Sequence, residues 1–130
     1  MQRAHHVLAY SDVTGAVLSA AHDVHSTLGP GLLESTYRMC LSHLLVKKGH
    51  CVDEEVAMPI RFQDLEIGTS YRADLIVDGC VLVEVKAVEH LSSVHEAQVL
   101  TYLRHSGLKV GLLVNFNVIR LRTGIRRFVR

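Results

Sequence analysis

The chain has 130 residues, 48% of them hydrophobic, and a formal net charge of +1. This is enough apolar material for one globular domain, which we expect over residues 1–130, without metal or disulfide staples. The three cysteines form no C-x-x-C pair, which excludes a disulfide framework or zinc knuckle and favours a reducing, cytoplasmic setting. No apolar run approaches the roughly 18 residues of a membrane span, so we expect no membrane partner.

Periodicities along the chain predict a mixed α/β domain. Apolar residues at three- and four-residue steps predict a first helix, which Gly29-Pro30-Gly31 ends, and Ser93 with Glu96 has the spacing of a capping box. The elements expected in chain order are helices at 11–28 and 32–48, strands at 52–62, 67–77 and 80–88, a helix from 93 to about 107, a strand at 108–116, and short strands at 118–122 and 125–129. We summarise this order as ααβββαββ and expect a central mixed sheet flanked by helices.

Three charged residues interrupt the apolar segment RADLIVDGCVLVEVKA. Side chains alternate along a strand, so Glu84 and Lys86 share one face. A two-residue loop would place Asp74 on the other face, whereas a three-residue connection over 77–79 brings all three charges to one face. We therefore predict an odd-length loop with Gly79 in the left-handed conformation.

Charges among apolar residues need a partner, solvent or an ion. Two carboxylates close together make a hard-oxygen site for Mg²⁺ or Mn²⁺, ions that polarise phosphoryl oxygens and lower the pKa of bound water. A neighbouring ammonium at Lys86 would hold that water or stabilise developing negative charge. Cross-strand ion pairs, Arg72 with Glu84 or Asp74 with Lys86, explain the same residues without any metal, and the motif alone does not decide.

The segment GPGLLESTY contains a G-x-x-E-x-x-Y pattern. Together with RADLIVDGCVLVEVKAVEHL, HEAQVLTYLRHSGLKVGLLVNF and the Gly124-Ile-Arg126 close, it resembles the GxxExxY proteins of the PD-(D/E)XK nuclease superfamily, from about residue 12 to residue 130. The resemblance implies a restriction-endonuclease-like core with an active site. The residues implied as catalytic are Asp74, Glu84, Lys86 and Glu34, and those implied to hold Mg²⁺ or Mn²⁺ are Asp74, Glu84, Glu34, the carbonyl of Val85 and His25.

Further residues are assigned to nucleic-acid contact. Gln98 and Tyr102 lie four apart on one helical face and resemble the glutamine and tyrosine motif of RecB-like members, although an exposed glutamine and a core tyrosine are an open alternative. The C-terminal arginines would follow phosphates or simply keep an edge strand soluble. Where relatives tend to carry glutamine, this chain has Glu55. The predicted substrate-binding set is Gln98, Tyr102, Tyr37, Arg72, Arg120, Arg122 and Arg126.

The function expected from these residues is Mg²⁺- or Mn²⁺-dependent hydrolysis of phosphodiester bonds, with DNA as the nucleic-acid partner. The alternative is a catalytically silent module on the same fold that binds nucleic acid or a protein, because a fold does not settle a function. A homodimer built on the C-terminal strands is a further hypothesis.

Overall fold

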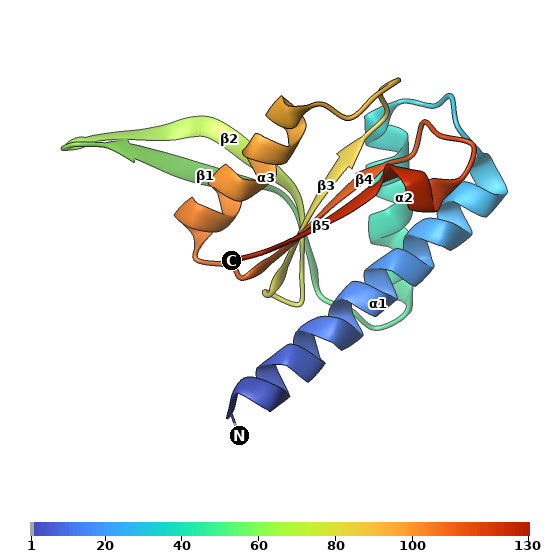
Figure 1. Cartoon of the computed structure of the whole chain (residues 1–130), viewed down its shortest axis with the longest axis horizontal. Coiled ribbons are helices and arrows are strands. Elements are labelled where there is room, and N and C mark those ends of the chain that lie inside the picture. Colours follow the sequence, from blue (N-terminus) through green and yellow to red (C-terminus); the bar gives the residue numbers. More distant parts are fainter. Residues whose placement is uncertain (1) are drawn as a thin grey trace.

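The computed structural model describes residues 2–130, with side chains described for 10–68 and 71–130. Over these residues the chain forms three α-helices, five strands and one short 3₁₀ helix (Figure 1). Their bounds are α1 Gln2–Leu28, α2 Glu34–Lys47, β1 Val52–Phe62, β2 Leu65–Val77, β3 Val81–Lys86, α3 Ser93–Ser106, β4 Val110–Asn115, η1 Leu121–Gly124 and β5 Ile125–Val129. The predicted mixed α/β fold is confirmed.

The five strands make one mixed sheet in the order β1-β2-β3-β4-β5. Neighbouring strands are antiparallel except β3 and β4, which run parallel and are joined through α3. A parallel pair needs such a crossover, because the chain must return to the same end of the sheet. Strands β1 and β2 are the longest strands of the sheet, and the hairpin that they form extends well beyond the other strands (Figure 1).

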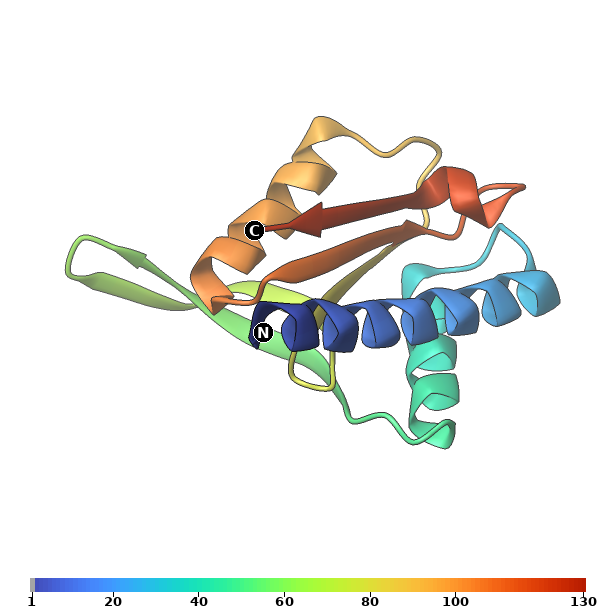
Figure 2. The same ribbon diagram turned by 60° about the horizontal axis from the view of Figure 1, so that its bottom comes forward.

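Helices cover both faces of the sheet, α1 and α2 on one side and α3 on the other (Figure 2). On the α1/α2 face, Leu41 and Leu45 of α2 share a buried cluster with Val83 and Val85 of β3. On the α3 face, a second buried cluster includes Leu82 of β3 with Tyr102 and Leu103 of α3, and Leu113 of β4. The central strands β3 and β4 are therefore buried on both faces, which explains their nearly continuous apolar sequence.

The segment between β4 and β5 differs from the prediction of a short strand at 118–122. Leu121 is buried in the α1/α2-face cluster, and the chain turns through η1 instead of pairing. The turn brings Gly124 so close to the carbonyl oxygen of Asn115 that any Cβ at residue 124 would clash with it. This tight contact is what lets β5 fold back antiparallel to β4.

The capping box of α3 lies one residue earlier than predicted. Ser92, not Ser93, is the N-cap, and its hydroxyl accepts the N–H of His95 at 3.4 Å. The His95 ring in turn accepts the Ser92 N–H at 3.0 Å. A histidine therefore fills the role that we assigned to Glu96, because its Nδ1 offers the same acceptor at the third helical position.

Candidate active site

The connection between β2 and β3 has the odd length that the charge cluster requires. Val77 pairs with Val81, so the loop is the three-residue segment 78–80, one residue later than predicted. Asp78 and Gly79 both have left-handed backbones, with φ of 52° and 66°. Continuing the same register places Asp74 across from Glu84.

At Asp74, the alternation of side chains along β2 changes, so that residues two apart lie on opposite faces of the sheet. Leu75 packs in the α1/α2-face cluster, whereas Ala73, two residues away, packs in the α3-face cluster. Residues two apart in a regular strand share a face, so the strand rolls over at Asp74. The paired register of β2 with β3 also ends at Leu75, next to this position.

Strand β1 rolls over at the same level. Val52 packs toward the α1/α2-face cluster and Val56 toward the α3-face cluster, and between them Glu55 has a φ of 49°. The β1–β2 register is the same on both sides of Glu55, so no residue is inserted and the two strands turn together. We call this feature the hairpin roll, defined by Glu55 on β1 and Asp74 on β2.

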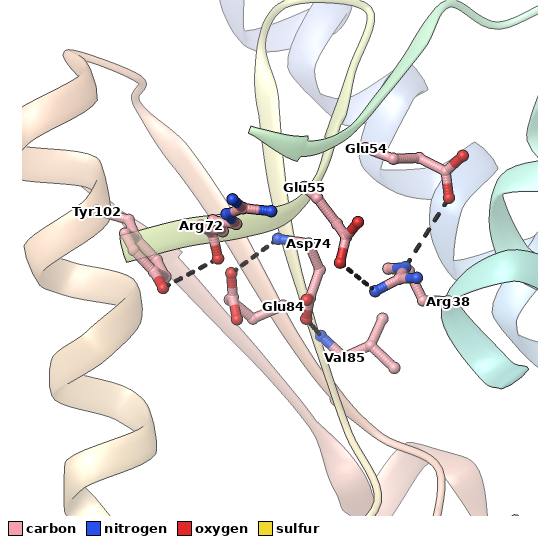
Figure 3. A network of polar contacts seen from close by, with 8 residues as sticks. All are labelled: Arg38, Glu54, Glu55, Arg72, Asp74, Glu84, Val85 and Tyr102. Carbon is pink, nitrogen blue, oxygen red and sulfur yellow. Dashed lines mark hydrogen bonds and ion pairs between the residues drawn. The ribbon is translucent and has the colours of Figure 1, made fainter. Parts of the chain in front are cut away.

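At the hairpin roll, two carboxyl groups, in place of backbone carbonyl groups, accept hydrogen bonds from backbone N–H groups of the neighbouring strand (Figure 3). The N–H of Asp74 donates to Oε1 of Glu84 at 3.1 Å, and the N–H of Val85 donates to Oδ2 of Asp74 at 2.7 Å. Each acid thus satisfies an amide of the opposite strand, which fixes both side chains between β2 and β3. This exchange explains how two acids are held side by side in an apolar sheet.

Burial makes this pair electrostatically unfavourable. Glu84 is only 3% exposed, and its burial, reinforced by the negative charge of Asp74, raises its pKa to about 8. Burial also raises the pKa of Asp74, and the charge of Glu34 adds to this rise. The positive charge of Lys86 opposes both shifts. The pair therefore gains from any additional cation at this point.

The other two predicted catalytic residues, Lys86 and Glu34, differ in how they relate to the two carboxyl groups. Lys86 ends β3, is half-buried, and acts electrostatically on both carboxyl groups, yet among the described residues it makes no ion pair within 4.0 Å. Glu34 is the exposed first residue of α2 and lines a shallow pocket with Ala87, directly after Lys86. Its charge reaches Asp74, but within the described part of the chain no three His, Cys, Asp or Glu side chains form a metal-binding group.

Tyr37, which we predicted to contact substrate, is held inside the fold. It is fully buried and its ring stacks on Phe116 at 4.6 Å between centroids. Its hydroxyl donates to the Gly29 carbonyl at 2.6 Å and accepts the N–H of Leu32 at 3.1 Å. Both bonds fold the glycine-rich turn onto α2, which places Glu34 at the helix start. The G-x-x-E-x-x-Y segment is therefore held together by its own hydrogen bonds, and it carries Glu34 at the start of α2.

Tyr102, which we predicted to contact nucleic acid, is buried close to Glu84 (Figure 3). Its hydroxyl donates to the carbonyl of Arg72 at 3.1 Å, and its ring meets Tyr71 edge-on at 4.8 Å. Burial and then the charges of Glu84 and Asp74 raise the pKa of the Tyr102 hydroxyl. Tyr102 thus ties α3 to β2 next to the hairpin roll, while the Arg72 side chain stays exposed.

The remaining predicted substrate-binding residues lie on α3 and on the segment after β4. Gln98 is half-buried on α3, four residues before Tyr102. Arg120 and Arg122 are exposed, and Arg126, also exposed, caps the carbonyl of Thr123 and lies 4.0 Å from Glu96.

His25, which we predicted as a metal ligand, has one ring nitrogen engaged by the backbone. Its Nε2 lies 2.7 Å from the carbonyl oxygen of Val118, and its ring is tilted against Phe116. A carbonyl oxygen only accepts hydrogen bonds, so Nε2 carries the proton and is not free to bind a metal. His25 fastens α1 to the turn before η1.

Sequence reasoning missed Arg38. Its guanidinium donates to Glu55 at 3.0 Å and lies 3.9 Å from Glu54 (Figure 3). The position, one helical turn after Glu34, was a usable signal, because residues four apart share a helix face. Its partners could not be inferred, since they lie on β1, beyond the end of the helix.

A mixed sheet whose buried central strand ends in an acid-x-lysine, with a second acid opposite, defines the class of PD-(D/E)XK nucleases. A family model described as PD-(D/E)XK nuclease superfamily matches residues 11–128, and the chain belongs to this superfamily. No curated protein matches the chain, and neither does any solved structure. Within residues 2–130, no helix is both long and apolar enough to cross a membrane.

The residues present fit a divalent cation. Superfamily nucleases generally use such ions, and Mg²⁺ and Mn²⁺ favour carboxylate and carbonyl oxygens. The fit rests on the donor set and its electrostatics: a buried acid, Glu84, lies next to a half-buried one, Asp74, and both have raised pKa values that Lys86 offsets only partly. A divalent ion would supply the missing positive charge.

Proposed function

We propose that this chain is an Mg²⁺- or Mn²⁺-dependent nuclease that hydrolyses phosphodiester bonds of DNA. The observation that carries the proposal is the Asp74–Glu84 pair, held by backbone amides at the end of a buried strand that continues into Lys86. Superfamily membership supports nuclease activity, and the resemblance to GxxExxY proteins adds Glu34.

Each residue has a proposed task. Asp74, Glu84 and the carbonyl of Val85 hold the ion, which when bound polarises a phosphoryl oxygen and lowers the pKa of a coordinated water. The Lys86 ammonium, beside both carboxyl groups, orients the attacking water and stabilises charge on the phosphoryl group. Glu34, exposed at the start of α2, holds water at the outer side of the site.

Exposed cations around the site would contact the DNA backbone. Arg72 lies next to the hairpin roll, and Arg120 and Arg122 follow β4. Such contacts position a duplex or a single strand without reading its sequence. Gln98 and Tyr102 of α3 would support these contacts. Tyr102 would do so through its hydrogen bond to the carbonyl of Arg72.

The test is cleavage of labelled single-stranded and duplex DNA with Mg²⁺, Mn²⁺ or EDTA. We expect metal-dependent cleavage that falls by at least about a hundredfold in Glu84→Gln and in Lys86→Ala, since ligand and charge-stabilising groups typically supply that much. The matched control is Glu66→Gln, which removes an exposed carboxylate on the distal part of β2 and should cleave normally. Equal activity in all variants would mean a contaminating nuclease.

The silent-module alternative makes a different prediction. It gives salt-dependent binding of nucleic acid in gel shifts, without cleavage by either metal. A protein that neither binds nor cuts DNA or RNA would overturn the nuclease proposal and the nucleic-acid-binding form of the alternative, and would leave only its protein-binding form. The homodimer hypothesis stays a prediction for light scattering, with the edge strand β5 as its proposed interface.

A further inference from the structure

We infer that Arg38 is a positioning residue for the Asp74–Glu84 pair. Its ion pair with Glu55 would hold the hairpin roll, and the roll holds the two carboxyl groups against opposite-strand amides. The consequence for catalysis rests on the proposed nuclease function, whereas the consequence for the geometry does not.

The left-handed backbone conformation at Glu55 requires stabilising interactions. Three non-glycine residues among those described have positive φ: Glu55, Gln63 and Asp78. Gln63 and Asp78 lie in the loops that join β1 to β2 and β2 to β3, where left-handed residues are usual. Glu55 alone lies inside a strand, and a left-handed glutamate there is strained. Interactions around it must offset that strain.

Arg38 supplies such interactions from a position on α2 that the core fixes. In a regular strand, Glu54 and Glu55 would point to opposite faces. Here one guanidinium reaches both, at 3.9 Å and 3.0 Å, which the left-handed backbone at Glu55 makes geometrically possible. Arg38 follows the fully buried Tyr37, so its own backbone is fixed by the core.

Burial strengthens the pair. The Arg38 side chain is 19% exposed, and its Nε is buried with no hydrogen-bond partner among the described residues. The largely buried guanidinium depends on its few acceptors, so losing Glu55, itself 51% exposed, leaves the charge of Arg38 uncompensated. Figure 3 shows Arg38 of α2 joined to Glu54 and Glu55 of β1, the strand that pairs with β2 on both sides of Asp74.

A direct role, in which Arg38 binds a phosphate of the substrate, is the competing explanation. Glycine at residue 55 separates the two, because glycine adopts a left-handed backbone without strain and needs no ion pair to hold it. If Arg38 acts through the roll, Glu55→Gly should make Arg38 dispensable. If Arg38 binds phosphate, Glu55→Gly cannot restore what Arg38→Met removes.

The experiment compares wild type, Arg38→Met, Arg38→Lys, and the double variant Arg38→Met with Glu55→Gly. The first measurement is amide hydrogen exchange at Asp74 and Val85 in the metal-free protein, read by NMR. We expect faster exchange at both amides in Arg38→Met, a smaller change in Arg38→Lys, and recovery in the double variant. This measurement is independent of whether the protein cuts DNA.

The second measurement is Mn²⁺ affinity by calorimetry together with kcat and KM for DNA cleavage. Loss of a residue that orients metal ligands typically lowers affinity or activity by about 10- to 100-fold. We expect that loss in Arg38→Met, mainly in kcat, with restoration in the double variant. Glu66→Gln, which removes an exposed carboxylate on the distal part of β2, is the matched control and should behave as wild type.

The outcomes separate the claims. Unchanged exchange in Arg38→Met, or faster exchange that the double variant does not restore, overturns the inference even if the protein is an active nuclease. An exchange pattern that follows the prediction in a wild type that neither binds Mn²⁺ nor cleaves DNA supports Arg38 as the holder of the roll and overturns the proposed function instead. Arg38→Met that unfolds in a melting scan is replaced by Arg38→Lys with and without Glu55→Gly.

Discussion

Replacing Glu84 by glutamine should change how stability depends on pH. Burial and the charge of Asp74 raise the pKa of Glu84 from a usual 4.5 to about 8. Because the folded state then binds this proton more tightly than the unfolded chain, the metal-free wild type loses stability as pH rises from about 4.5 toward 8. Glu84→Gln carries no such proton, so it escapes this loss.

The size of the effect follows from the width of that window. Each pH unit inside it costs up to about 1.4 kcal/mol, and the pKa of about 8 already includes the opposing charge of Lys86. We expect Glu84→Gln and wild type to be similar at pH 5, and the variant to be more stable by roughly 2 to 4 kcal/mol at pH 8.

The assay is urea unfolding followed by circular dichroism in EDTA at pH 5, 6, 7 and 8. The exposed Glu66→Gln serves as control and should keep the wild-type pH dependence. Adding Mn²⁺ should flatten the wild-type curve, because the ion favours the ionised pair. Parallel curves for Glu84→Gln and wild type, or a wild type that gains on the variant as pH rises, would refute the reasoning.

Two substitutions test the structural parts of the site. Tyr37→Phe keeps the stacked ring but removes the hydroxyl between Gly29 and Leu32, so we expect a loss of about 1 to 3 kcal/mol and a melting temperature several degrees lower; an unchanged melting curve would contradict the described bonds. Gly124→Ala places a methyl group against the Asn115 carbonyl and should cost about 1 to 3 kcal/mol in urea unfolding, whereas a stability gain would show that the turn is less tight.

Much of the fold could be predicted because its signals are local. The bounds of β1 and β5 match the predicted 52–62 and 125–129, and strand alternation required the odd loop before Val81 once the three charges were taken to share one face. The shared face of Asp74 and Glu84 followed from the same argument, whereas their direct pairing depends on a loop one residue later than predicted. These features depend on periodicity and turn length, which are visible in the sequence.

Features that depend on distant contacts could not be predicted. The hairpin roll occurs at Glu55, which carries no glycine signal, and its partner Arg38 lies 17 residues earlier. Tyr37 is conspicuous in its motif, but only the fold shows that its hydroxyl closes the turn behind it. The predicted strand at 118–122 failed because burial of Leu121 outweighed local strand preference.

Crystals soaked with Mn²⁺ and measured for anomalous scattering test the central claim most directly. We predict a peak between the carboxyl groups of Asp74 and Glu84, within coordination distance of the Val85 carbonyl, that disappears in Glu84→Gln. A peak elsewhere only, or no peak with both carboxyl groups still bound to their opposite-strand amides at saturating Mn²⁺, would contradict a metal-dependent active site at the hairpin roll.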